Sequence, residues 1–359
     1  MQAGELLTAL LPTRNRPHNI SGQLNLFTKS SLRVVVADSS DPQKAAEIKA
    51  ASSGLAQLLS YAPDMKFFDK LADAIEQIET PFVLLASDRK ITFPHAVTAA
   101  LAFMREHEDY VSAQGWVIGF SKYGDDIDIN RIVFFTPTID SEEPLWRHYH
   151  LMRRYQSRQF SVFRVGPLKT AIAQARTIEG PVFQEVMFMN ALVLQGKVAR
   201  LPNIFTLQTP EQSFNRLRDI DPFYWFLHDL HSFHRHYISY QNSLARFISE
   251  RNLTRLARRD LLQVIGAVHA VWLHYNFDFS VLNRATQQLL NGEDLNLPNP
   301  YSPASWRDIG PGDVVHAEHG ARRYIWRSNV LNAEPMEEIL ITPGEMARVE
   351  RQLEAYYGS

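Results

Sequence analysis

Residues 32–40 read Leu-Arg-Val-Val-Val-Ala-Asp-Ser-Ser, a short apolar run that ends in polar residues. A β-branched run of this length, bounded by turn-forming Asp and Ser, predicts a strand buried on both faces. Similar runs lie on either side, at 6–11 before Pro12 and at 82–86 before Ser87-Asp88. Helical patterns separate them, at residues 44–60, 69–79 and 95–107. This alternation predicts an α/β fold, with a mostly parallel sheet and helices on both faces.

Polar clusters follow three of these predicted strands. They are Thr13-Arg14-Asn15-Arg16, Asp38-Ser39-Ser40 and Ser87-Asp88-Arg89-Lys90. In open α/β sheets, ligands bind outside the carboxyl ends of the strands. We therefore expect the three clusters to converge on one edge of the sheet and to form a binding site there.

The pattern is less regular further along the chain. Additional strands are predicted at 65–68, 110–120, 131–136, 160–165 and 197–208, and helices at 144–156 and 182–194. From Pro222 to about Leu290 the pattern becomes helical, with few β-rich runs. This shift predicts two domains, an α/β domain over 1–212 and a mainly helical C-terminal domain over 213–359.

The composition excludes several classes of protein. The 359 residues carry a net charge of −2, which gives no global electrostatic case for a nucleic-acid partner. Cysteine is absent, which excludes disulfides, thiolate metal sites and cysteine nucleophiles and fits a cytoplasmic protein. No apolar run is long enough for a transmembrane helix, which leaves peripheral membrane association and homo-oligomer formation open.

Several segments together resemble one family. Residues 10–17 (LLPTRNRP), 34–40 (VVVADSS) and 80–88 (TPFVLLASD) resemble the opening of GT-A fold nucleotide-sugar glycosyltransferases, and most closely the family-2-like bacterial enzymes. Downstream, Phe160–Arg164, Gln184-Glu185 and the stretch from Leu194 to Pro202 fit the same subgroup. The resemblance covers about residues 5–210 and implies a GT-A fold that binds a nucleotide-sugar donor.

The resemblance also implies roles for individual residues. Glu185 lies where these enzymes keep an acidic catalytic base, and Asp88 lies where their Asp-rich metal motif falls. The residues expected to bind the nucleotide-sugar are Pro12, Thr13, Arg14, Asn15, Arg16, Asp38, Lys70, Ser87, Asp88 and Arg89. Asp38 would accept a hydrogen bond from the base or ribose. From the residues alone, Asp88 is equally a helix N-cap and Asp38 an ordinary turn residue.

The sequence departs from the family at the metal motif. Two or three adjacent carboxylates are usual there, whereas this chain has one, Asp88, followed by Arg89 and Lys90. Mg²⁺ or Mn²⁺ needs oxygen ligands, usually one or two carboxylates with the substrate phosphates. Asp88 could supply one ligand, and inward-pointing cations would repel the ion. The sequence therefore leaves metal dependence open.

A basic segment offers another way to neutralise phosphates. Between Leu145 and Ile178 there are no acidic residues, while six Arg and one Lys occur. Arginine forks match phosphate geometry. We take Arg147, Arg154 and Arg164 as candidates for binding phosphate or an anionic acceptor; the alternative is a solvated basic face.

Glu185 lies within an apolar stretch, Val182–Met189, so its carboxyl should be desolvated and its pKa raised toward that of a useful base. The alternative is a surface Glu that pairs with a nearby Arg.

We therefore predict a glycosyltransferase of the hexosyltransferase type. It would move a sugar to a hydroxyl of a glycan, a lipid-linked glycan or a protein, with inversion implied by the resemblance. Two alternatives stay open. One is a metal-independent enzyme in which Arg and Lys replace the cation, and the other is a catalytically inactive GT-A-like binding or scaffold protein.

Overall fold

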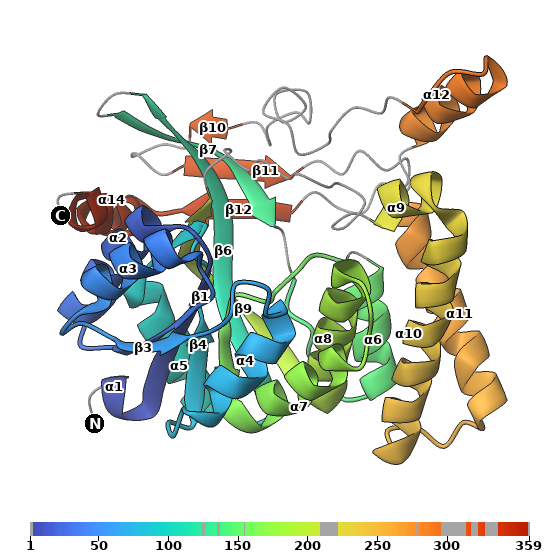
Figure 1. Ribbon diagram of the computed structural model, residues 1–359, viewed down its shortest axis with the longest axis horizontal. Coiled ribbons are helices and arrows are strands. Elements are labelled where there is room, and N and C mark those ends of the chain that lie inside the picture. Colours follow the sequence, from blue (N-terminus) through green and yellow to red (C-terminus); the bar gives the residue numbers. More distant parts are fainter. Residues whose placement is uncertain are drawn as a thin grey trace.

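The structure is a computed structural model of the chain. It describes residues 3–123, 126–134, 137–153, 155–208, 222–276, 279–295, 314–316, 322–326 and 337–357. Within these residues, nine strands form one sheet in the order β3-β2-β1-β4-β8-β6-β9-β5, with β7 paired to β6 (Figure 1). The strands are β1 (Leu7–Thr13), β2 (Arg33–Asp38), β3 (Gln57–Ser60), β4 (Phe82–Leu85), β5 (Lys90–Thr92), β6 (Tyr110–Tyr123), β7 (Asp126–Phe134), β8 (Val162–Arg164) and β9 (Lys197–Gln208).

The parallel character predicted for the sheet lies mainly in its first four strands. β3, β2, β1 and β4 pair with one another in parallel. Beyond β4 the sheet is mixed, because β8 and β7 pair antiparallel with their neighbours while β6 and β9 are parallel. Thr13 at the end of β1 lies opposite Asp38 at the end of β2, and Leu10 lies opposite Leu85 of β4. The carboxyl ends of these strands therefore meet at one edge.

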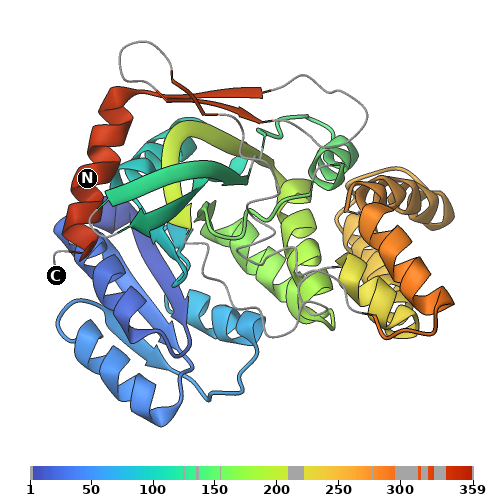
Figure 2. The same ribbon diagram turned by 90° about the horizontal axis from the view of Figure 1, so that it is seen from above.

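Helices cover both faces of the sheet, as predicted (Figure 2). Strand β2 explains why, because Val34 and Val36 face one hydrophobic core and Val35 and Ala37 face the other. The helices of this part are α1 (Ala3–Leu6), α2 (Pro17–Lys29), α3 (Pro42–Ser52), α4 (Phe67–Glu76), α5 (Pro94–Glu106), α6 (Pro144–Met152), α7 (Val165–Arg176) and α8 (Pro181–Gln195).

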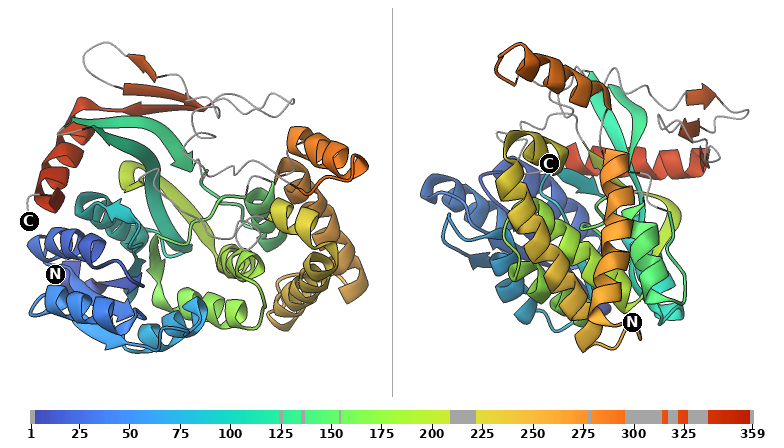
Figure 3. Two further views of the ribbon diagram at one scale, coloured as in Figure 1. Left: turned by 45° about the horizontal axis from the view of Figure 1, so that its top comes forward. Right: turned by 90° about the vertical axis from the view of Figure 1, so that its right-hand side faces the viewer.

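The described residues from Pro222 to Leu290 are mainly helical, as predicted, and they lie beside α6 and α8 (Figure 3). Tyr240 stacks on Phe183 of α8, with 5.5 Å between ring centroids. Among the described helices, none is long and apolar enough to cross a bilayer. The helices are α9 (Pro222–His228), α10 (Leu230–Glu250), α11 (Arg258–Asn276) and α12 (Phe279–Leu290).

The last described segments leave this helical region. Strands β10 (Val314–His316), β11 (Arg322–Trp326) and β12 (Glu337–Ile341) form a separate antiparallel sheet. Helix α14 (Pro343–Tyr357) then packs against α2, where Tyr356 Oη donates to Asn19 O at 3.4 Å (Figure 1). The region after residue 212 thus contains strands as well as helices, and its final helix joins the core of the first part through Val349 and Leu353. The boundary near residue 212 stays a prediction.

Two predicted elements are wrong. The helix expected over 44–60 ends at Ser52, because Gly54 takes a left-handed φ of 72° and the chain then turns into β3. The strand expected over 65–68 is instead the start of α4. There Phe68, Leu71 and Ile75 recur at helical spacing and are buried together.

Candidate functional site at the carboxyl edge of the sheet

Three strand-end residues meet at the carboxyl edge of the sheet. Thr13 Oγ1 donates to Asp88 Oδ2 at 3.0 Å, and Thr13 is also the register partner of Asp38. All three side chains are buried. The predicted convergence of the polar clusters after β1, β2 and β4 is therefore confirmed.

The loop after β1 wraps around the carboxylate of Asp88. The Arg14 amide lies 3.4 Å from Asp88 Oδ2, and Arg16 Nη1 lies 2.9 and 3.1 Å from the two carboxylate oxygens. Asn19 of α2 donates to the backbone carbonyl of Asp88 at 2.7 Å. Pro12 is buried within β1, so the exposed part of this loop is residues 14–16.

Asn15 ties the same loop to the end of β2. Its backbone has a positive φ of 60°, a conformation that Asn tolerates better than most residues. Its amide N–H donates to Ser40 Oγ at 2.7 Å, and its side chain exchanges two hydrogen bonds with Asp41. Ser40 in turn donates to Asp38 Oδ1 from both its amide and its hydroxyl. Asp38 thus serves as a turn residue while lying at the predicted site.

Lys70 of α4 lies beneath this edge. Its Nζ donates to the Thr13 carbonyl at 2.9 Å and to Ser39 Oγ at 2.8 Å. Burial lowers the pKa of Lys70 to about 8, although the nearby carboxylates of Asp88 and Asp38 oppose that shift. Lys70 therefore crosslinks the ends of β1 and β2 from inside the protein.

More positive charge gathers beyond Asp88. Ser87 Oγ accepts from the Arg89 amide at 3.1 Å and shapes the turn. Burial lowers the pKa of the Arg89 guanidinium, as does the neighbouring charge of Arg16, while Asp88 acts in the opposite direction. The edge thus carries several cations around one carboxylate.

Glu185 lies near this edge, on the first turns of α8. Tyr155 Oη donates to Glu185 Oε1 at 3.0 Å, and the Ser157 hydroxyl hydrogen-bonds the same carboxyl. Burial raises the pKa of Glu185, while these two bonds and the charge of Lys90 counteract the rise. Burial also lowers the pKa of Lys90 to about 8, opposed by Glu185. Because Lys90 follows Asp88 by two residues, Glu185 is brought close to the end of β4.

These residues do not fit a divalent metal ion. The Asp88 carboxylate already accepts from Thr13, Arg14 and Arg16, and cations rather than further carboxylates surround it. Across the described ranges, no three His, Asp or Glu side chains lie close enough together to hold an ion. Asp88 remains the one predicted ligand at this edge.

The predicted phosphate-binding arginines lie elsewhere or outside the described residues. Arg147 is buried and donates to the carbonyls of Val193, Leu194, Ser141 and Glu142, where it caps the end of α8. Arg164 donates to the carbonyls of Met104, His107 and Tyr110. Both guanidinium groups are therefore bonded to backbone carbonyls, and a role of either in binding phosphate stays a prediction. Arg154 lies outside the described residues.

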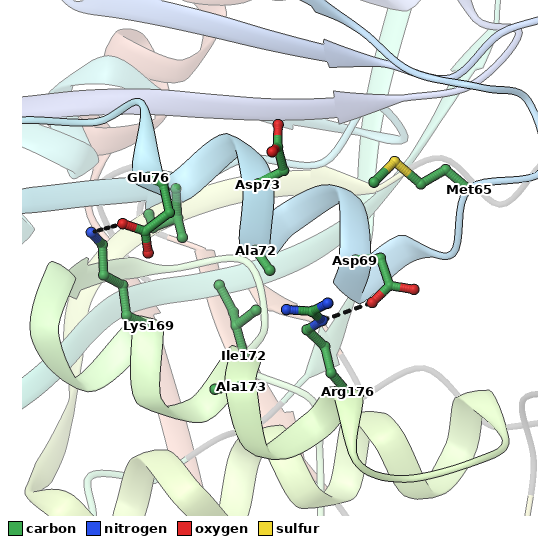
Figure 4. Close-up of a pocket in the computed structure, with 10 residues that line it drawn as sticks. Met65, Asp69, Ala72, Asp73, Glu76, Lys169, Ile172, Ala173 and Arg176 are labelled. Carbon is green, nitrogen blue, oxygen red and sulfur yellow. Dashed lines mark hydrogen bonds and ion pairs between the residues drawn. The ribbon is translucent and has the colours of Figure 1, made fainter.

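Two other cations of the basic segment line a cavity of about 400 Å³ between α4 and α7 (Figure 4). Lys169 pairs with Glu76 at 2.7 Å and Arg176 with Asp69 at 2.7 Å. The figure shows the two pairs at opposite ends of the cavity. These two ion pairs connect α4 to α7, and each cation is already neutralised by its partner carboxylate.

The sequence places Lys90 in the polar cluster after β4 but gives no sign of its effect on Glu185, and it does not single out Tyr155 or Asn19 for this region. The charges of Lys90 and Glu185, which are far apart in the chain, shift each other's pKa in the fold. Tyr155 lies in an irregular segment with no motif of its own. Only Asn19 had a usable signal, because it lies one helical turn beyond Arg16.

Comparison with known proteins gives a likeness in structure. No protein-family model matches the sequence, and no curated protein matches it either. S. aureus TarS 1-349 in complex with UDP-GlcNAc is 15% identical, with a TM-score of 0.50 over 77% of this chain and 74% of TarS 1-349. Another structure of S. aureus TarS 1-349 is 16% identical, with a TM-score of 0.48 over 77% of this chain and 73% of that one. Mannosyl-3-phosphoglycerate synthase from Rubrobacter xylanophilus is 13% identical, with a TM-score of 0.39 over 70% and 77%. The likeness to the UDP-GlcNAc complex shows the fold, and the chain has the GT-A-like α/β fold expected from its sequence.

Proposed function

We propose that the protein is a nucleotide-sugar-dependent glycosyltransferase that moves a sugar to an acceptor hydroxyl. The observation that carries this proposal is the meeting of Thr13, Asp38 and Asp88 at one edge, with Glu185 close by. Ligands of open α/β sheets bind at such an edge. The similar fold of TarS, whose structure holds UDP-GlcNAc, supports a nucleotide-sugar as the donor class.

The donor would bind against residues 12–16, Asp38 and Asp88. The loop is already ordered around Asp88 by Thr13 and Arg16, so little rearrangement is needed to receive a ribose or base. Lys70 holds the ends of β1 and β2 together beneath this site through its hydrogen bonds to Thr13 and Ser39.

Glu185 would act as the base. The acceptor oxygen attacks the anomeric carbon, the bond from that carbon to the phosphate oxygen breaks, and the hydroxyl proton passes to Glu185. A direct displacement of this kind inverts the configuration. Burial raises the pKa of Glu185 and so makes it a stronger base, while Lys90 keeps its ionised form populated.

Arginine and lysine would neutralise the leaving diphosphate. Arg16, Arg89 and Lys90 lie around the end of β4, and preorganised cations stabilise charge that develops on a leaving group. Arg16 is partly exposed and could transfer its bonds from Asp88 to phosphate oxygens. This supports a metal-independent reaction.

One observation favours the alternative of an inactive binding protein. The Asp88 carboxylate is fully engaged by protein donors, as expected if it had lost its catalytic role.

Calorimetric titration with nucleoside diphosphates, with and without Mn²⁺ and with chelator, separates these possibilities. Nucleotide binding that Mn²⁺ does not change supports the metal-independent enzyme, in which Arg and Lys replace the cation. Nucleotide binding that Mn²⁺ enhances supports a metal-dependent enzyme instead. If no nucleotide binds, monophosphates included, the scaffold alternative stands and the transferase proposal is wrong. A screen of nucleotide-sugars for donor hydrolysis then identifies the sugar.

A further inference from the structure

One cation of the basic segment differs from its neighbours. Arg147 and Arg164 are held by backbone carbonyls, and Lys169 and Arg176 by carboxylates. Arg158 is 2% exposed and donates through Nη2 to the Pro137 carbonyl, but its Nε and Nη1 have no hydrogen-bond partner. Within the described part of the chain, no carboxylate contacts it.

Ser161 connects the Arg158 backbone to the sheet. Ser161 Oγ lies within hydrogen-bonding distance of two acceptors, the Arg158 carbonyl at 2.7 Å and Gln114 Oε1 of β6 at 2.9 Å. Gln114 lies opposite Arg200 of β9 in the sheet register. Arg158 is therefore anchored over β6 and β9.

A second guanidinium lies beside the first. Arg200 stacks over the Trp116 ring at 3.7 Å, and its amide donates to Thr138 Oγ1, next to the Pro137 that Arg158 contacts. Burial, together with the charge of Arg200, lowers the pKa of Arg158 to about 9. Two like charges thus lie near each other, with Arg158 shielded from water and Arg200 partly exposed.

For Arg158 this arrangement is unfavourable on its own. A buried charge is normally paired and hydrogen-bonded, and a buried donor left without a partner destabilises the fold. Packing alone would be served better by an apolar side chain of similar volume. The arrangement becomes favourable if an anion joins it, because guanidinium groups bind oxyanions through two parallel hydrogen bonds.

The position of Arg158 relates it to the proposed base. Tyr155 and Ser157 of the same segment contact Glu185, and Arg158 is the next residue. Arg158 and the two side chains that contact Glu185 therefore belong to one short segment.

We infer that Arg158 and Arg200 form a binding subsite for an oxyanion, the phosphate or carboxylate group of an anionic acceptor. The acceptor role rests on the proposed function, whereas the oxyanion site rests on the two arginines alone. Because the free donors of Arg158 are shielded from water, the segment 155–160 has to shift for the anion to enter. The bound anion would then be held in a low-dielectric setting, where its attraction to the guanidinium groups is strong.

Phosphate titration followed by thermal unfolding tests this site. The experiments use an Arg16→Met background, which removes a cation from the donor edge, and inorganic phosphate is compared with chloride at equal ionic strength. Arg158→Met and Arg200→Met are the test variants. Arg164→Met is the control, because that arginine is bound to backbone carbonyls.

We expect phosphate to raise the unfolding temperature in the background protein and in the Arg164→Met control. Each test variant should bind phosphate about tenfold or more weakly, the loss expected for a charge-assisted hydrogen bond. Without phosphate, Arg158→Met should be at least as stable as its background. Acetate in place of phosphate tells whether a carboxylate serves as well.

If phosphate still raises the unfolding temperature of both test variants as it does in the background protein, the inference is wrong. It is also wrong if phosphate does not raise the unfolding temperature of the background protein. Arg200 is partly exposed, so Arg200→Met carries the test if Arg158→Met does not fold. Nucleoside diphosphate titration of the wild type tests the proposed function separately. Its failure would leave the oxyanion site standing and remove only the acceptor role.

Discussion

Arg16 and Asp88 are 72 residues apart in the chain, yet Arg16 Nη1 lies 2.9 Å from one Asp88 carboxylate oxygen and 3.1 Å from the other. The pair closes the loop after β1 onto the end of β4. It places a permanent positive charge on the carboxylate that the sequence assigns to a metal. This is the clearest structural reason to expect nucleotide binding without a divalent ion.

Replacing Arg16 tests that relationship. Arg16→Met should weaken nucleoside diphosphate binding about tenfold, because one charge-assisted contact to phosphate is lost. The same change frees Asp88, so Mn²⁺ should now enhance binding. Calorimetry with and without Mn²⁺ measures both effects. Arg33→Met, at the opposite end of β2, is the control and should bind as the wild type does. Unaltered nucleotide affinity in Arg16→Met would contradict a role for Arg16 in binding the phosphates.

Removing the proposed base should affect turnover more than binding. Glu185→Gln keeps the shape of the side chain and its contact with Tyr155 but cannot take a proton. We expect turnover to fall by a factor on the order of 10²–10⁴ with nucleotide affinity nearly intact. Turnover comes from steady-state assays of sugar transfer and affinity from calorimetry. Glu179→Gln, an exposed glutamate, serves as control. A Glu185→Gln enzyme as fast as the wild type would remove Glu185 from the mechanism.

Lys90 should set the acidic limb of the pH–rate profile. Its positive charge lowers the pKa of Glu185, so Lys90→Met should raise that pKa. The base then needs a higher pH to ionise, and the acidic limb of kcat/KM should move to higher pH. Lys169→Met, whose charge is matched by Glu76, should leave the limb where it is. A purely structural role for Lys90 predicts lower activity at every pH with no movement of the limb.

Lys70 should make stability depend on pH. Burial lowers its pKa in the folded protein from 10.5 to about 8. Between these values the unfolded chain binds more protons than the folded one, so the free energy of unfolding should rise with pH through this window. The full effect is about 3 kcal/mol. Urea unfolding from pH 7.5 to 10.5 should show this rise in the wild type relative to Lys70→Met, in which the contribution is absent. Lys49→Met, an exposed control, should follow the wild type, and identical slopes in all three proteins would refute the prediction.

Gly115 should be required for the close approach of β6 and β9. A Cβ atom at this position would clash with the Asn203 carbonyl, where the register between the two strands shifts. Gly115→Ala should therefore reduce the free energy of unfolding by about 1–3 kcal/mol. Gly166→Ala in α7 has open space around it and should be neutral or slightly stabilising. Equal stability of the two variants in urea would show that the strands can separate freely at Gly115.

The main features of the fold could be predicted from local sequence. The runs that become β1, β2 and β4 are apolar on both faces and short, and such runs are stable only between two layers of helix. Their polar ends had to meet, because parallel strands place all their carboxyl ends at one edge. The loop after β1, Asp38 and Asp88 were therefore within reach of sequence reasoning.

The partner of each charged side chain was decided by tertiary structure. Nothing in the sequence distinguishes Arg147, bound to the end of α8, from Arg158, buried with two unpartnered donors. Both belong to one basic run, and each guanidinium has at least one partner that is distant in the chain, Val193 for Arg147 and Pro137 for Arg158. The effect of Lys90 on Glu185, and the return of α14 to α2, arise in the same way. Hydrophobic periodicity reports which face of an element is buried, but it carries no information about which distant atom lies opposite that face.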